Sequence, residues 1–527
     1  MAETGYVYQH ERVGVATLPL MESALLSTAA KSLVQIEFAP QPLIPERALE
    51  AGEQYRFHFD MTKCIGCKCC VVACNEQNGN PAALNWRRVG EVEGGHYPFT
   101  ERYHLSMGCN HCLEPSCLIG CPVEAYTKDA NTGVVLHSAD TCIGCQYCTW
   151  NCSYGVPQYN EERGVVGKCD MCHNRLSDGM APACVAACPE GAIAIEIVNV
   201  AQWRSDYLSA NAPGLPSADD SISTTRVTLP ENMLPDTDRV DLQRVRPEHP
   251  HLPLVFMLVL TQLSVGAFAV LWLLDMFKQG GSLTIGALAS LGLAAVSLGA
   301  STLHLGRPIY AWRALKGLRR SWLSREVLTL SLFAGAANAF AAMLMFNLPA
   351  RPAMGLCTVL AGLAGVTCSA RIYIVPARPA WFSNYTFAEF FSTALFLGPL
   401  FVQALLANTL AQPVPSWIRI AAIVGASAQL IAQALKFLWL TRSEVFELRA
   451  SSLLLSGCFR NLFLLRLALL VMIAGALSQS NAGGRWMVTA AFLAALAGEW
   501  LGRYLFFVSV VPKNIAAAFT SGERMAA

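Results

Sequence analysis

The stretch CIGCQYCTWNC, from Cys142 to Cys152, places four cysteines within eleven residues. Its spacing is C-x2-C-x2-C-x3-C, and the group that runs from Cys64 to Cys74 repeats it. Two further groups, which begin at Cys109 and Cys169, lengthen the middle gap to four and eleven residues. A proline follows the last cysteine of both longer groups. Four cysteine groups of one design therefore decide how the first half of the chain folds.

This spacing is the ligand pattern of bacterial ferredoxins, in which three thiolates of a group hold one cluster and the fourth reaches another. Four groups of four thiolates satisfy four [4Fe–4S] clusters with no ligand missing. The proline after the last cysteine suits the first turn of a helix, where a missing N–H is tolerated. The sixteen predicted iron ligands are Cys64, Cys67, Cys70, Cys74, Cys109, Cys112, Cys117, Cys121, Cys142, Cys145, Cys148, Cys152, Cys169, Cys172, Cys184 and Cys188.

Two other uses of cysteine explain the pattern less well. A structural zinc site needs paired C-x2-C units and gives no reason for the third cysteine or the C-x3-C-P ending. A secreted disulfide framework would require an export signal, and we expect none in the N-terminal residues. Cys69 is left over and is interpreted as a packing residue, as are the three cysteines of the apolar second half, Cys357, Cys368 and Cys458.

The second half has the composition of a membrane protein. The whole chain of 527 residues is only 14% charged, against about 25% in soluble domains. Apolar runs of about 20 residues, enough to cross the bilayer as helices, account for this low share. We predict eight such spans, at 253–277, 283–303, 327–348, 353–372, 386–408, 417–440, 460–479 and 486–511.

The fold class follows from these two halves. Alternating segments at 55–60 and 192–199 predict strands that flank the cysteine groups. We therefore expect an α+β double-ferredoxin-like iron–sulfur domain, followed by an all-α polytopic membrane domain of eight transmembrane helices. The predicted divisions are an N-terminal extension 1–54, the four-cluster domain 55–200, a polar linker 201–250, the membrane domain 251–515 and a C-terminal tail 516–527.

The cysteine domain resembles the four-cluster iron–sulfur subunits of the molybdopterin oxidoreductases, which include dimethyl sulfoxide reductase and the membrane sulfite dehydrogenase. The stretches CIGCKCC, CNHCLEPSC and CIGCQYC and the C-P endings carry the resemblance. In that family the first group pairs with the fourth, and the second with the third. The resemblance implies four ligand sets: Cys64, Cys67, Cys70 and Cys188; Cys74, Cys169, Cys172 and Cys184; Cys109, Cys112, Cys117 and Cys152; and Cys121, Cys142, Cys145 and Cys148.

The membrane half resembles the anchor subunit of dimethyl sulfoxide reductase. The stretches HPHLPLVFMLVLTQLSVGAF, STLHLGRPIYAWRAL, SWLSRE and ARIYIVPARPAW carry this second resemblance. In the family the anchor is a separate subunit without haem, so its fusion to the cluster domain departs from the usual arrangement. The resemblance implies electron transfer between a molybdopterin-containing catalytic subunit, which must be a partner, and quinone in the membrane.

A quinone site needs a titratable group, because quinol chemistry moves protons together with electrons. His304, at the end of the second span, is the leading candidate, and the family anchor has a histidine at a matching position. Glu389 is a second candidate, because ionisable residues inside spans are costly and are often functional. Glu499 and Arg503 are four residues apart on one helix and are expected to pair.

The distribution of basic residues predicts the orientation. The loop after the second span carries six Lys or Arg residues and lies on the side of the cluster domain. Positive-inside counting therefore places that domain on the cytoplasmic face of a bacterial inner membrane. Docking of the loop on the cluster domain is the alternative reason for its charge, and a periplasmic placement stays open. The cytoplasmic side would suit sulfite oxidation, and the periplasmic side would suit reduction of S- or N-oxides.

One other class of function fits the outline of the chain. A polytopic membrane transporter with a metal-binding regulatory domain would also combine cysteine groups with apolar spans. Transporters usually show broken helices, midspan polar sites and repeats, and the spans show scattered charges without an obvious repeat. The net charge of +1 gives no basic field that would indicate a nucleic-acid partner.

Overall fold

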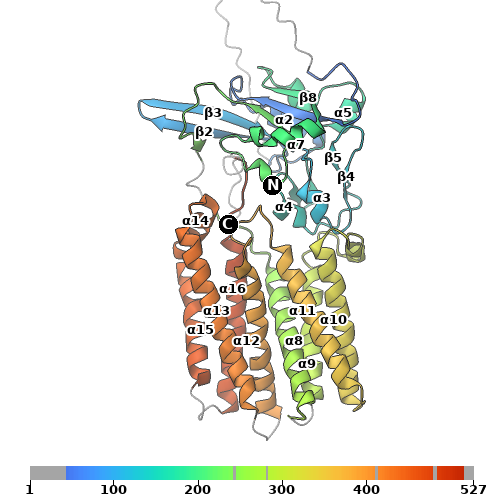
Figure 1. Ribbon diagram of the computed structural model, residues 1–527, viewed down its shortest axis with the longest axis vertical. Helices are drawn as coiled ribbons and strands as arrows, with labels where there is room; N and C mark the ends of the chain where they lie inside the picture. The colour runs from blue at the N-terminus through green and yellow to red at the C-terminus, as the bar shows by residue number, and fades with distance from the viewer. Residues whose placement is uncertain (1–42, 241–244, 280–282, 410–413, 479–483, 516–527) are drawn as a thin grey trace, which may run out of the picture. The chain divides into compact units, whose positions relative to one another are not determined.

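The computed structural model describes residues 43–240, 245–279, 283–409, 414–478 and 484–515. The predicted tail 516–527 and most of the predicted extension 1–54 lie outside these residues. Within them, an α+β domain with small sheets precedes a region of long helices (Figure 1), which confirms the predicted fold class.

The central sheet of the cluster domain joins its two ends. Strand β1 (Glu53–Asp60) pairs antiparallel with β8 (Ile193–Asn199), which lies after the last cysteine, and parallel with β9 (Arg226–Thr228). Both strands predicted from alternation are therefore present. Phe57 and Phe59 of β1 are buried with Ile193 and Ile195 of β8, so the alternating face packs into the core of this domain.

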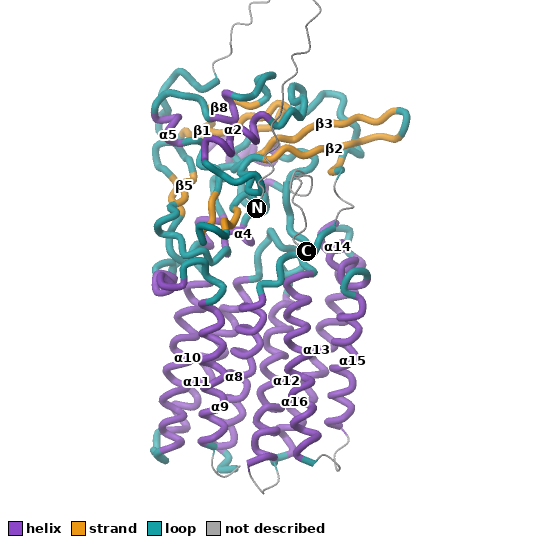
Figure 2. The backbone as a smooth tube through the Cα atoms, turned by 180° about the vertical axis from the view of Figure 1, so that it is seen from behind, coloured by secondary structure: helices purple, strands orange, loops and turns teal. Residues whose placement is uncertain are grey.

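Small hairpins and short helices make up the rest of this domain. The longest hairpin, β2 (Arg88–His96) and β3 (Phe99–Met107), projects from it (Figures 1 and 2), and Tyr97 and Phe99 at its tip are exposed. The other hairpins pair β4 (Tyr126–Lys128) with β5 (Val135–His137) and β6 (Gln158–Asn160) with β7 (Val165–Gly167). The short helices are α2 (Cys69–Asn78), α3 (Ser116–Gly120), α4 (Tyr147–Asn151), α5 (His173–Ser177), α6 (Ala183–Ala186) and α7 (Val200–Asp206).

Part of the segment 201–250, which was predicted to be a linker, folds together with the cluster domain. It contributes β9 to the central sheet and β10 (Asp238–Arg239) to the edge of β2. Trp203 and Thr224 from this segment are buried, and Thr224 donates a hydrogen bond to the carbonyl of Asn110 at 2.7 Å. The polar composition predicts a path over the surface of the cluster domain toward the membrane, and the pairing of β9 and β10 is what holds the segment on that domain.

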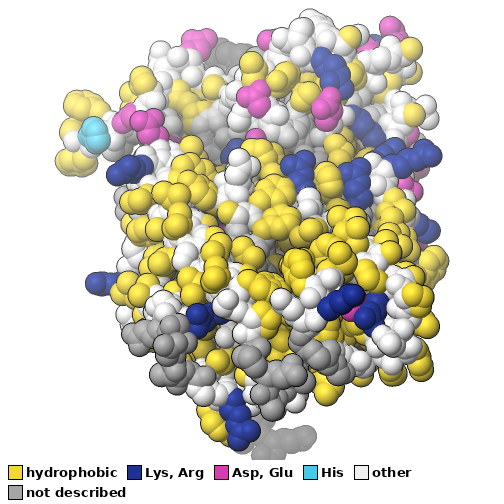
Figure 3. Space-filling view, turned by 60° about the horizontal axis from the view of Figure 1, so that its bottom comes forward, with side chains coloured by type: hydrophobic (Ala, Val, Ile, Leu, Met, Phe, Trp, Pro, Cys, Tyr) yellow, Lys and Arg dark blue, Asp and Glu magenta, His cyan; other side chains and the backbone are white. Residues whose placement is uncertain are grey.

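Within the described residues, eight helices are long and apolar enough to cross a membrane, as predicted. They are α8 (Leu252–Met276), α9 (Thr284–Thr302), α10 (Trp322–Met345), α11 (Arg351–Ile372), α12 (Asn384–Thr409), α13 (Ser416–Arg442), α15 (Arg460–Ser478) and α16 (Arg485–Val508). A shorter helix, α14 (Phe446–Ser456), follows α13. Figure 3 shows hydrophobic side chains over most of the visible surface of the helical region.

The long helices form two groups of four. Helices α8 to α11 pack together as the first bundle, and α12, α13, α15 and α16 pack together as the second (Figure 2). Helices α8 and α12 pack against each other and join the two bundles. They are also the most buried of the eight, because each faces both groups.

The loop between α9 and α10, residues 303–321, binds the cluster domain through its backbone. The amide of Arg307 donates to the carbonyl of Ile143 at 3.1 Å, and the amide of Gly317 donates to the carbonyl of Pro122 at 2.8 Å. Ser321 Oγ donates to the carbonyl of Gly120 at 2.7 Å. These contacts lie beside Cys121, Cys142 and Cys145, so the membrane loop is held directly against the third cysteine group.

A glycine permits the closest part of this contact. A Cβ at Gly306 would collide with the carbonyl oxygen of Gly164, which is backbone and cannot turn away. We expect Gly306→Ala to weaken the interface by about 1–3 kcal/mol, the usual cost of overpacking. Hydrogen exchange should become faster in residues 139–145 and 303–321 and stay unchanged in β1 and β8. Gly299→Ala is the control, because its Cβ would meet nothing within 4 Å. Equal exchange in both variants would contradict this role of Gly306.

Candidate functional site: cysteine clusters and an adjoining membrane cavity

The cysteine groups sit in tight loops whose backbone amides face the sulfur atoms. Gly144 has a positive φ of 69°, and its amide donates to Cys142 Sγ at 3.4 Å. The amide of Met171 donates to Cys169 Sγ at the same distance. The amide two residues after a thiolate is thus aimed at it, an arrangement that stabilises negative charge on sulfur.

The thiols interact electrostatically in four sets. Burial raises the pKa of Cys74 to about 12, and the charges of Cys184 and Cys172 contribute to the increase. Burial likewise raises the pKa of Cys112 to about 12, with contributions from Cys109 and Cys152. The other two sets show the same behaviour: Cys64 with Cys67, Cys70 and Cys188, and Cys145 with Cys121, Cys142 and Cys148. Each of these neighbour relations lies within one of the four ligand sets that the family resemblance implies, and those sets stay a prediction.

Further interactions put the four sets in a row. Cys70 of the first set interacts with Cys184 of the second, and Cys169 of the second interacts with Cys109 of the third. Burial raises the pKa of Tyr126, and the charges of Cys148 and Cys117 raise it further, so Tyr126 lies between the third and fourth sets. The order along the row is therefore first, second, third and fourth set, ending near the membrane loop.

The arrangement fits iron–sulfur clusters better than single ions. Among the described residues, no three His, Cys, Asp or Glu side chains converge closely enough to hold one metal ion. The first and third cysteine sets instead each line a cavity of their own. Sulfur ligands spread around a cavity are what a cubane of iron and sulfide requires.

Buried cations support the same conclusion. Burial alone would lower the pKa of Arg87, but the thiolates of Cys184 and Cys70 raise it above its ordinary value. Arg87 Nη2 is buried and has no hydrogen-bond partner among the described residues. Lys168 is 3% exposed, and its Nζ lies 3.8 Å from Cys109 Sγ. Unpaired buried cations are costly, and negatively charged clusters beside them would supply the missing counter-charge.

A membrane cavity of about 280 Å³ lies next to the fourth set. Its lining includes Cys145, Tyr147 and Trp150 from the cluster domain and residues from α8 to α11. Most of the lining is apolar, and the polar groups are few, which is the usual composition of a small-molecule pocket. Sequence reasoning could not find this cavity, because it forms between elements about 200 residues apart in the chain.

His304 lies in this cavity, between the fourth cysteine set and the helices. Burial lowers the pKa of His304 to about 4, while a hydrogen bond with the backbone of Cys145 acts in the opposite direction. His304 Nε2 has no partner among the described residues. One imidazole nitrogen is therefore held by the cysteine loop, and the other is available to a ligand in the cavity.

Glu326 lines the same cavity, and the sequence analysis did not select it. It is buried in the second turn of α10, which begins at Trp322. The predicted span began at residue 327, because only the apolar run was counted, and Glu326 fell just outside it. Its place in the SWLSRE stretch that carries the family resemblance was the available signal.

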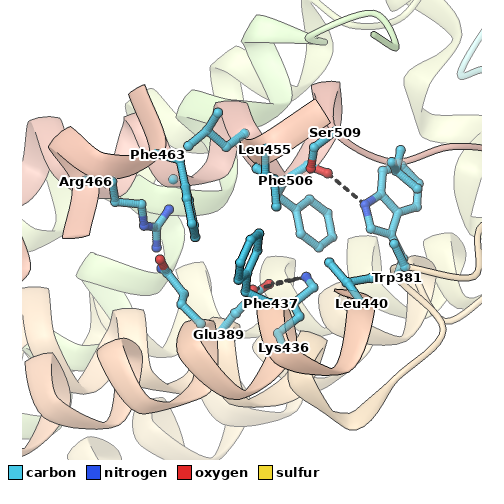
Figure 4. A pocket seen from close by; sticks show the side chains of 15 residues that line it. Trp381, Glu389, Lys436, Phe437, Leu440, Leu455, Phe463, Arg466, Phe506 and Ser509 are labelled. Carbon is cyan, nitrogen blue, oxygen red and sulfur yellow. Dashed lines mark hydrogen bonds and ion pairs between the residues drawn. The ribbon is translucent and has the colours of Figure 1, made fainter. Parts of the chain in front are cut away.

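Glu389, the second predicted quinone-site residue, is not in this cavity. It lines a separate cavity in the second bundle, where its carboxylate pairs with Lys436 Nζ at 3.1 Å (Figure 4). The two candidates therefore line different cavities. Arg503 donates to Gln262 at 3.0 Å, and Glu499 pairs with Arg466 at 3.5 Å, so the expected Glu499–Arg503 pair is replaced by contacts with other helices.

Comparison with known proteins agrees with both halves of this arrangement. Residues 100–197 match the 4Fe-4S dicluster domain family, and residues 247–508 match the DMSO reductase anchor subunit (DmsC) family. One component of the anaerobic dimethyl sulfoxide reductase of Haemophilus influenzae is 37% identical over 177 residues, which cover 32% of this chain and 85% of the relative. The chain belongs to the dimethyl sulfoxide reductase family.

Two further relatives cover the same domain. The corresponding component of the Escherichia coli enzyme is 38% identical over 173 residues, which cover 31% of this chain and 83% of the relative. One component of the sulfite dehydrogenase of Allochromatium vinosum is 37% identical over 155 residues, which cover 25% of this chain and 65% of the relative. This member of the dimethyl sulfoxide reductase family joins the iron–sulfur protein and the membrane anchor in one chain. The family assignment favours electron transfer, with a catalytic subunit as partner, over the transporter alternative.

Lys168 should tune the clusters of this dimethyl sulfoxide reductase family protein. Removing a positive charge next to Cys109 disfavours the reduced state, so Lys168→Met should lower the reduction potential of an iron–sulfur cluster held by Cys109 by on the order of 100 mV. Redox titration followed by EPR measures the shift. Lys63→Met is the control, because Lys63 is half-exposed and its charge is screened by solvent. An unchanged potential in an iron-replete Lys168→Met protein would contradict this role of the lysine.

Proposed function

We propose that the chain carries electrons through four [4Fe–4S] clusters between a molybdopterin-containing catalytic subunit and quinone in the membrane. The cavity beside Cys145 is the observation that carries the proposal. It brings a ligand of the predicted fourth cluster and the unpartnered Nε2 of His304 to one space of about 280 Å³. A quinone in that space would lie next to the last redox centre of the row.

The residues of the cavity suit quinone chemistry. A bound quinone supplies the redox chemistry, since it takes up or gives up two electrons and two protons. The free Nε2 of His304 can accept a hydrogen bond or a proton from a quinol hydroxyl. Glu326 provides a carboxyl group from α10 to the same cavity. Trp150 and Tyr373 present aromatic faces on which a flat ring can pack.

The partner would bind at the other end of the row. Cys67 of the first set is exposed, and Ile65 and Val72 beside it are 60% exposed each. An apolar surface around an exposed cluster ligand fits a subunit that must receive or deliver electrons there. In the relatives' chemistry, that subunit would oxidise sulfite or reduce an S- or N-oxide.

The quinone site is tested by replacing its histidine. We expect His304→Ala to retain about sixteen irons per chain and to lose quinol-driven reduction of the clusters at least about a hundredfold, because the proton acceptor is gone. Stopped-flow absorbance of the anaerobic complex measures the rate. Glu326→Gln should behave in the same way.

His96→Ala is the matched control, since His96 lies on the projecting hairpin away from the cavity. Normal quinol-driven reduction in His304→Ala would exclude the residue from the site. An iron content far below sixteen in the unmodified protein would overturn the assignment of four clusters.

We also propose that the cluster domain faces the cytoplasm of a bacterial cell. Arg307 and Arg313 of the basic loop donate to carbonyls of the cluster domain, so part of its charge is used for docking. The remaining basic residues on that side of the membrane support the cytoplasmic orientation by the positive-inside rule. They are Lys316, Arg319, Arg320, Arg442, Arg449 and Arg460.

The orientation can be read from fusions to the C-terminus, which eight spans place on the same side as the cluster domain. A fluorescent protein that matures only in the cytoplasm should fluoresce, and an alkaline phosphatase fusion should be inactive. The reverse pair of results would establish the periplasmic orientation.

A further inference from the structure

The second bundle contains a cavity of its own, which the proposed function does not use. Charged and polar side chains from three helices line it: Glu389 from α12, Gln433 and Lys436 from α13, and Arg466 from α15 (Figure 4). Its volume is about 50 Å³, against about 280 Å³ for the cavity beside His304. We call this space the ionic chamber. It is too small for a quinone ring and large enough for a few water molecules.

The ionic chamber is built into the fold. Arg466 lies across Gly502 of α16, where any Cβ would collide with the guanidinium group. Beyond Arg466, the carboxylate of Glu499 accepts hydrogen bonds from Thr393 at 2.6 Å and from Gln429 at 3.1 Å. Charges that looked scattered along the sequence thus converge from four helices on one place inside the bundle.

Two polar atoms at the ionic chamber lack partners among the described residues. They are Arg466 Nε and Gln433 Oε1, and their side chains belong to residues that are 5% and 7% exposed. Buried polar atoms are almost always hydrogen-bonded. One of these atoms donates and the other accepts, and water can satisfy both. The polar occupant indicated by these two atoms is therefore water.

One layer of aromatic rings separates the ionic chamber from the cavity beside His304. Tyr373 lines the His304 cavity and lies 5.3 Å, centroid to centroid, from Phe506, which lines the chamber. Trp150 and Trp381 bridge the two spaces in the same way at 5.6 Å. The Arg503 guanidinium lies 4.1 Å above Phe390, and the ring of Phe390 also contacts Tyr373.

Two residues of this layer carry polar groups: Tyr373, which has a hydroxyl, and Arg503, whose guanidinium lies over Phe390. Burial raises the pKa of Tyr373; the charge of Glu326 raises it further, and that of Arg503 lowers it. Tyr373 therefore lies within electrostatic reach of a carboxyl group in the quinone cavity and of a cation beside the chamber. A hydroxyl that both donates and accepts can pass a proton between two such spaces.

We propose that the ionic chamber is a proton-transfer site, in which Glu389 exchanges protons with the quinone cavity through water and Tyr373. The proposal rests on the proposed quinone function. Reduction of a quinone to a quinol forms two O–H bonds and consumes two electrons, which arrive from the clusters, and two protons. The Glu389 carboxylate takes up a proton from water and passes it toward the cavity, twice for each quinone reduced, and oxidation of quinol reverses these transfers.

Glu389→Gln tests the proposal, because glutamine keeps the size of the side chain and cannot exchange a proton. In the reconstituted complex it should retain iron and still bind a redox-inert quinone analogue. Quinol-driven cluster reduction should slow at least about tenfold, with a larger solvent deuterium effect. Glu389→Asp should restore most of the rate. Redox-difference infrared spectra should show a carboxyl band in the unmodified protein that is absent in Glu389→Gln.

Asp275→Asn is the matched control. Asp275 is also a buried carboxylate at a helix in the membrane domain, paired with Arg351 at 2.8 Å, but it lies at the opposite end of α8 from His304. This control should keep the rate and the infrared band. Equal rates and bands in Glu389→Gln and Asp275→Asn would overturn the proposal, as would loss of analogue binding in Glu389→Gln, which would place Glu389 in the quinone site.

Two outcomes distinguish a failure of the proton-transfer proposal from a failure of the proposed quinone function. If quinol fails to reduce the clusters of the unmodified complex, the proposed quinone function itself fails. If Glu389→Gln does not assemble, Glu389→Asp decides, because it retains a carboxylate beside Lys436. A shifted carboxyl band in Glu389→Asp supports proton exchange at this residue, and an unshifted band overturns it.

Discussion

The backbone contact between residues 139–145 and the loop after α9 is the constraint on which the rest of the structure depends. Backbone hydrogen bonds from Arg307 to Ile143 and from Gly317 to Pro122 hold the cysteine loops against the membrane loop, and the Arg307 and Arg313 side chains add further bonds. Cys145 and His304 are neighbours only because of this contact. The proposed electron transfer to quinone depends on that proximity, and the contact couples the two halves of the chain physically.

The cluster domain handles negative charge with buried cations and directed amides. Arg87 and Lys168 are almost fully buried, and the loops aim N–H groups at sulfur atoms. The membrane domain handles charge differently, by pairing carboxylates with Lys436, Arg466 and Arg351 inside or at the ends of the helices. In both halves, a nearby opposite charge or hydrogen-bond donor offsets the free-energy cost of burying a charged group. Charged groups can therefore stay where redox or proton chemistry can use them.

The architecture could be predicted from the sequence because the patterns that determine it are local. Cysteine spacing is fixed by the geometry of a loop around a cluster, and span length is fixed by the thickness of the bilayer. The site was predicted less completely. His304 was found from its motif, whereas Glu326 was missed because it precedes the apolar run of α10. Glu389 was chosen as an ionisable residue inside a span, but its distance from His304 could not be predicted, because a sequence does not show which bundle a span joins. The pairing of β9 and β10 was also hidden, since polar strands at a sheet edge look like a linker.

The strands β9 and β10 tie the connecting segment to the cluster domain before it enters α8. The tether between the cluster domain and α8 is therefore short. As a result, the effective concentration of the cluster domain near the loop 303–321 stays high. If a substitution weakened the contact with this loop, the two domains would separate and rebind repeatedly, because the chain would still join them. Separate iron–sulfur and anchor subunits must meet by diffusion. In this chain, each membrane domain is synthesised with one cluster domain already attached.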